Sequence, residues 1–150
     1  MSVKYFFENF NVGETVEIGR HAVTEAAILE FGRQYDPQPF HTDPERARTS
    51  IYGGLIASGW QTCSIVMRVM CDAYLSEAAS MGSPGMEEIR WLKPVRPGDV
   101  LVVMRTIEEA RPTSKADRGL VLSRWDVYNQ REEHVMMMRG YGLFGRKPVE

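Results

Sequence analysis

Hydrophobic and polar positions divide the chain into a mainly helical first half and a strand-rich second half. After a short strand predicted at residues 16–18, apolar residues recur at helical spacing over residues 28–35. Thr24 precedes them, and threonine commonly caps a helix N-terminus. Pro37 ends this helix, because the residue before a proline is pushed out of the α region.

Residues 58–75 form the most apolar segment of the chain and predict a second helix with little polar surface, wrapped by other structure. Between the two helices, residues 36–54 are rich in Pro, Gly, Thr and Ser and predict a loop with at most one helical turn, near 44–48. Strand patterns then follow at residues 87–92, 100–107, 120–128 and 135–144.

Consecutive strands with short connections favour an antiparallel meander. Together with the apolar helix, they predict an α+β fold in which a curved antiparallel sheet wraps around a long central helix. A length of 150 residues, with 43% hydrophobic and 25% charged residues, is typical of one globular domain, so we expect a single domain over 1–150.

The net charge and the cysteine content limit which binding partners and which cellular compartment we expect for this protein. The net charge of −2 predicts no general attraction to nucleic acid or anionic membranes. The apolar segment is interrupted by Gln61, Arg68 and Asp72, which argues against a membrane span. Cys63 and Cys71 lie about 12 Å apart along the predicted helix, too far for a disulfide. Reduced thiols and the lack of a signal-peptide pattern predict a cytoplasmic protein.

One short stretch carries an acid and an imidazole at close, fixed spacing. Asp36 and His41 lie five residues apart in a segment stiffened by prolines, and general acid–base catalysis needs such a fixed separation. Gly59 follows eighteen residues later, at the start of the apolar helix. Its N–H is among those without an intrahelical partner and is suited to a developing oxyanion. No combination of His, Cys and carboxylate has convincing metal-ligand spacing.

The segments that carry this chemistry are Asp36-Pro37-Gln38-Pro39-Phe40-His41, Asp43-Pro44 and Tyr52-Gly53-Gly54-Leu55-Ile56-Ala57-Ser58-Gly59. Together they resemble the signature of the MaoC-like dehydratases, a family that includes the (R)-specific enoyl-CoA hydratases. The family pattern is Asp-x-Asn-Pro-x-His followed by a Gly at the start of the central helix. The resemblance implies a hot-dog fold over most of the chain.

The resemblance also implies a role for each matching residue. Asp36 would accept a proton from water as hydroxide adds to C3 of a trans-2-enoyl-CoA. His41 would orient that water and protonate C2, and the Gly59 N–H would bind the thioester oxygen. The product would be an (R)-3-hydroxyacyl-CoA, with no metal or redox cofactor and with CoA only as part of the substrate.

Two residues depart from the family pattern, and two glycines have a less defined role. Gln38 stands where the family has Asn, and Ser58 stands where His is common. We expect both to support or orient the acid–base pair. Gly53 and Gly54 are candidates for substrate binding through close backbone approach or an unusual dihedral angle.

Two other functions share the fold. A hot-dog thioesterase would have an acidic residue on or near the central helix, and residues 58–61 offer none. A non-catalytic acyl-CoA-binding module remains the second alternative. The resemblance further implies a homodimer or a dimer-based oligomer, and it leaves open the acyl chain and whether the carrier is CoA or acyl carrier protein.

Overall fold

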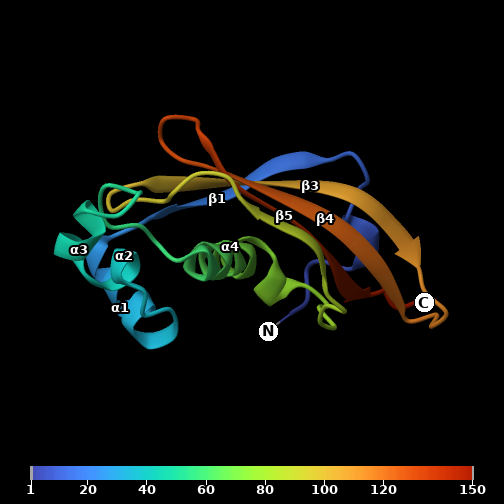
Figure 1. Ribbon diagram of the computed structural model, residues 1–150. Coiled ribbons are helices and arrows are strands. Elements are labelled where there is room, and N and C mark those ends of the chain that lie inside the picture. Colours follow the sequence, from blue (N-terminus) through green and yellow to red (C-terminus); the bar gives the residue numbers. More distant parts are fainter. Residues whose placement is uncertain (1, 150) are drawn as a thin grey trace.

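The computed structural model describes residues 2–149. One curved antiparallel sheet has the strand order β1-β3-β4-β5-β2, and α4 lies along its concave side (Figure 1). The other three α-helices gather at one end of the sheet (Figure 1). The elements are η1 (Phe7–Asn9), β1 (Thr15–Ala22), α1 (Glu25–Tyr35), α2 (Pro39–Thr42), α3 (Pro44–Arg48), α4 (Gly59–Ala73), η2 (Leu75–Glu77), β2 (Met86–Trp91), β3 (Val100–Pro112), β4 (Arg118–Tyr128) and β5 (His134–Gly145).

Alternation of side chains along the strands builds the core. In β3, Leu101, Val103 and Ile107 are fully buried and Arg105 on the same face is buried too, while Val102, Met104 and Thr106 between them are only half-buried. This period of two directs one face of the sheet toward α4. Helix α4 contributes Ile65 and Val66 to the same apolar cluster. Burial of this apolar surface holds the helix against the sheet.

The sheet wraps around one side of the apolar helix and leaves its other side open. Trp60 and Met67 of α4 are 57% and 49% exposed, because the sheet covers only the opposite face of the helix. The predicted start of the helix is confirmed, since the Ser58 hydroxyl caps it by accepting the Trp60 N–H at 3.3 Å.

The predicted meander is confirmed for β3, β4 and β5 and is wrong for β2. Strand β2 pairs antiparallel with β5 at the far edge of the sheet, and β3 pairs instead with β1. The connection over residues 92–99 therefore runs from one edge of the sheet toward the other. Its Val95 carbonyl accepts the Ala57 N–H at 2.8 Å, which ties the connection to the segment before α4.

Two further differences concern local structure. Residues 36–54 contain two short helices, α2 and α3, where at most one turn was expected. Each begins at a proline, Pro39 or Pro44, and proline is favoured at the first helical position. Strand β1 is longer than predicted because ladder pairing with β3 recruits polar residues such as Thr15 and Arg20. Among residues 2–149, none of the helices has the length and apolar character needed to cross a membrane.

Candidate active site

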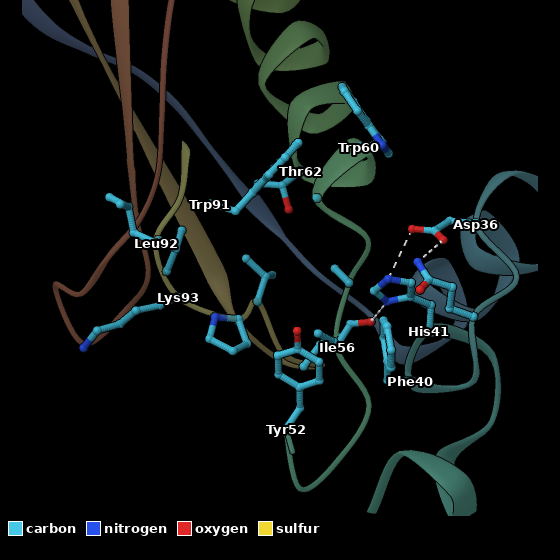
Figure 2. A pocket seen from close by; sticks show the side chains of 16 residues that line it. Asp36, Phe40, His41, Tyr52, Ile56, Trp60, Thr62, Trp91, Leu92 and Lys93 are labelled. Atoms are coloured by element: carbon cyan, nitrogen blue, oxygen red, sulfur yellow. Dashed lines mark hydrogen bonds and ion pairs between the residues drawn. The ribbon is translucent and has the colours of Figure 1, made fainter. Parts of the chain in front are cut away.

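His41 is buried on α2 and is fixed through both ring nitrogens (Figure 2). Its Nδ1 lies 2.7 Å from the carbonyl oxygen of Ile56, a contact that requires the proton on Nδ1. Its Nε2 lies 3.2 Å from Oδ2 of Asp36. The nitrogen that can exchange a proton is therefore Nε2, and it faces a carboxylate.

Asp36 ends α1 and receives two hydrogen bonds. The Gln38 amide donates to Oδ1 at 2.7 Å, and the Ser58 hydroxyl donates to Oδ2 at 2.8 Å. Burial by itself would raise the pKa of Asp36, but these hydrogen bonds and the charge of His41 outweigh it and hold that pKa below its usual value. The carboxylate is consequently ionised at neutral pH and able to accept a proton.

The approach of α2 to α1 depends on a glycine. A Cβ built on Gly32 of α1 would lie 2.7 Å from the carbonyl oxygen of His41 and 3.0 Å from its Cβ. Any larger residue would have to displace α2. Gly32 thus allows the imidazole to come within reach of Asp36, which lies one turn further along α1.

The first turn of α4 leaves one N–H available. The N–H groups of Trp60, Gln61 and Thr62 are all accepted by the hydroxyl or carbonyl oxygen of Ser58. No acceptor is found for the Gly59 N–H among residues 2–149. The indole of Trp91 lies against Gly59 so closely that a Cβ there would be within 2.4 Å of it. Only glycine leaves room for this packing.

These groups border a cavity of about 460 Å³ (Figure 2). One part of its wall is buried and mainly apolar, and the remainder opens to solvent beside aromatic and basic side chains. The buried part is lined by His41, Ile56, Ala57, Thr62, Val95 and Val135, and the open part by Trp60, Trp91, Leu92, Lys93 and Pro94. The cavity can hold an apolar group next to the acid–base pair and a polar carrier toward solvent.

Five of the seven residues singled out from the sequence come together here: Asp36, Gln38, His41, Ser58 and Gly59. Gly53 and Gly54 are not among the lining residues. Gly53 has a φ of 67°, which agrees with the expected unusual dihedral angle, and a Cβ on Gly54 would lie 3.5 Å from the Arg96 guanidinium. Their part in substrate binding stays a prediction.

Three residues that contribute to the site were not predicted from the sequence. The Ile56 carbonyl carries no signal in the sequence, since every residue has a carbonyl group. Trp91 lies more than thirty residues from Gly59 and reaches it only through the sheet. Thr62 could have been found, because it lies one helical turn after Gly59 and so shares its face. Among the described residues 2–149, no group of His, Cys, Asp and Glu is arranged to hold a metal ion.

Known proteins are similar to this chain over most of its length. Residues 8–122 match the family model described as MaoC like domain. A MaoC-like dehydratase from Rhodospirillum rubrum superposes with a TM-score of 0.89 at 40% identity, covering 97% of this chain and 100% of that one. An uncharacterized protein of Bacillus subtilis, YdeM, is 27% identical over 85% of this chain and 90% of its own length.

A more distant structure supports the fold. The R-hydratase PhaJ1 from Pseudomonas aeruginosa superposes with a TM-score of 0.74 at 21% identity, covering 97% of this chain and 90% of that one. The sheet wrapped around α4 is thus the hot-dog fold that the sequence predicted.

Proposed function

Because this chain belongs to the MaoC-like dehydratase family, we propose that it is an (R)-specific hydratase that interconverts trans-2-enoyl-CoA and (R)-3-hydroxyacyl-CoA. The observation that carries the proposal is the placement of His41 Nε2 and Asp36 Oδ2, 3.2 Å apart, on the wall of a cavity that Gly59 also lines. Hydration of an enoyl thioester needs a base, an acid and an oxyanion donor, and these residues supply one of each.

In the hydration direction, a water molecule between Asp36 and His41 loses a proton to the carboxylate as its oxygen bonds to C3. The π electrons of C2–C3 move toward the thioester carbonyl and form an enolate, whose oxygen accepts the Gly59 N–H. His41 then delivers the proton on Nε2 to C2. The proton on Asp36 passes to Nε2 across 3.2 Å, so both groups return to their starting states.

General principles set the size of each contribution. Acid–base assistance accounts for about 10²–10⁴-fold in rate. One well-placed oxyanion donor lowers the barrier by roughly 3 to 4 kcal/mol. The lowered pKa of Asp36 keeps its carboxylate ionised at neutral pH, and the ionised form is the one that can receive the first proton.

The two parts of the cavity indicate the orientation of the substrate. The enoyl group fits the buried apolar wall, since transfer of apolar surface out of water is favourable. The carrier then leaves past Lys93 toward solvent. The Lys93 ammonium forms an ion pair with Glu133 at 2.9 Å, so it is held at the opening.

Crotonyl-CoA provides the direct test. We expect purified protein to lower the absorbance of the enoyl-thioester band, with no release of free thiol, and longer trans-2-enoyl-CoAs to define the accepted chain length. Free thiol would instead identify a thioesterase. Saturable binding without turnover across the panel would identify an acyl-CoA-binding module.

We further propose that the working unit is a homodimer formed over the uncovered side of α4 and the edge strand β2. Exposed apolar side chains gather on these elements and on the segment between them, and patches of this kind mark interaction sites. Met67 and Met86 also line a second, apolar cavity of about 190 Å³. The exposed residues of this surface are Met67, Met81 and Met86.

Light scattering at micromolar concentration should give the mass of a dimer for the wild type. Replacing Met67 and Met86 together with lysine should yield a monomer, because two charges would be buried without partners. Val12→Lys serves as the control, since Val12 is 61% exposed and lies outside this surface. A monomeric wild type would rule out the proposed assembly.

A further inference from the structure

We propose that the hydroxyl of Thr62 is a second oxyanion donor, acting beside the Gly59 N–H on the thioester oxygen of the substrate. This role rests on the proposed hydratase function. Thr62 takes no part in the network that joins Asp36, Gln38, His41 and Ser58.

Helix geometry brings Thr62 over the first turn of α4. Thr62 follows Gly59 by three residues, so both lie on one face of the helix. Cα–Cβ bonds in a helix tilt toward its N-terminus, which directs the Thr62 side chain back over Gly59. Both residues line the cavity, and in Figure 2 the Thr62 hydroxyl points into it.

The hydroxyl of Thr62 makes no side-chain hydrogen bond within residues 2–149, and its oxygen is not among the fully enclosed polar atoms without a partner, so it is accessible from the cavity. Only 2% of the residue is exposed. Hydroxyls on helices commonly bond the carbonyl four residues earlier, as Ser64 does with Trp60 at 2.9 Å, but no such bond forms from the Thr62 side chain. The Thr62 hydroxyl can therefore donate to a ligand oxygen inside the cavity.

The surroundings of Thr62 limit what that ligand can be. Apart from His41 and Thr62 itself, the buried part of the wall consists of Ile56, Ala57, Val95 and Val135, whose side chains offer no polar atoms. The substrate oxygen that must approach this wall is the thioester carbonyl, because the Gly59 N–H already attracts it there. Negative charge on that oxygen grows as the enolate forms, so a second donor binds the transition state more tightly than the ground state.

Three variants test the role with crotonyl-CoA, whose acyl group carries no other polar atom. Thr62→Val keeps the shape and removes the hydroxyl, and we expect kcat to fall by about 10²-fold with a small change in KM. Thr62→Ser restores the hydroxyl and should recover most of the activity. Ser64→Ala removes a hydroxyl that is already bonded within the helix and should leave kcat unchanged.

A spectroscopic measurement separates this role from simple packing. The Asp36→Asn variant stops turnover, so crotonyl-CoA can be studied while bound. The carbonyl stretch of crotonyl-CoA bound to this variant should lie at lower frequency than that of free crotonyl-CoA. The shift should be smaller in the double variant that also carries Thr62→Val. An active wild type together with full kcat in Thr62→Val would overturn the inference alone. A wild type inactive on every enoyl thioester would overturn the hydratase function, and this role with it.

Discussion

Replacing Asp36 with asparagine is expected to lower kcat/KM for enoyl-thioester hydration by about 10³-fold, within the range of an acid–base contribution. Asparagine keeps the size of the side chain but cannot accept the proton of the attacking water. The hydrogen bonds from Gln38 and Ser58 show that the native structure favours a charged oxygen pair at this point. The rate of crotonyl-CoA hydration, measured by the loss of enoyl absorbance, gives the comparison.

Asp43→Asn is the matched control, because it makes the same chemical change seven residues away. The Asp43 carboxylate caps α3 by accepting the N–H groups of Glu45 and Arg46, and it does not line the cavity. Asparagine is a comparably good cap, so activity should be unchanged. If Asp36→Asn retained wild-type turnover with the thermal transition intact, Asp36 would not be the base.

The elements that the sequence predicted well are those with local signals. The central helix has an apolar stripe and a serine cap, and β3 and most of β4 follow a period of two, so their existence could be inferred before their partners were known. The position of β2 could not be inferred in this way, because its pairing with β5 and not with β3 depends on how residues 92–99 connect the edge of the sheet to β3. Distance along the chain carries no information about that connection.

The site residues can be separated in the same way, into those with a local signal in the sequence and those placed by tertiary contacts. Spacing within one motif placed Asp36 and His41 together, and the helix start placed Gly59, because each relation spans a short stretch of backbone. The Ile56 carbonyl and the Trp91 indole contribute through tertiary contacts that no motif encodes. The expected loop around His41 is instead a helical turn, and this turn fixes the ring in line with Asp36.

Gly32→Ala should lower kcat by about 10²-fold while leaving KM nearly constant, although Gly32 touches no part of the cavity. The added methyl group would lie 2.7 Å from the His41 carbonyl oxygen and 3.0 Å from its Cβ, closer than atoms pack. Helix α2 must therefore move away from α1, and the distance between His41 Nε2 and Asp36 must grow. Steady-state kinetics with crotonyl-CoA would measure the loss.

A measurement of thermal stability distinguishes this positioning effect from a general loss of folded protein. Alanine is favoured over glycine inside a helix by about 1 kcal/mol, which offsets part of the cost of displacing α2. The thermal transition should consequently shift far less than kcat does. Gln34→Ala, an exposed change on the same helix, should leave both quantities unaltered. Full activity in Gly32→Ala would mean that α2 can shift without separating the pair, and the 3.2 Å contact would then not limit the rate.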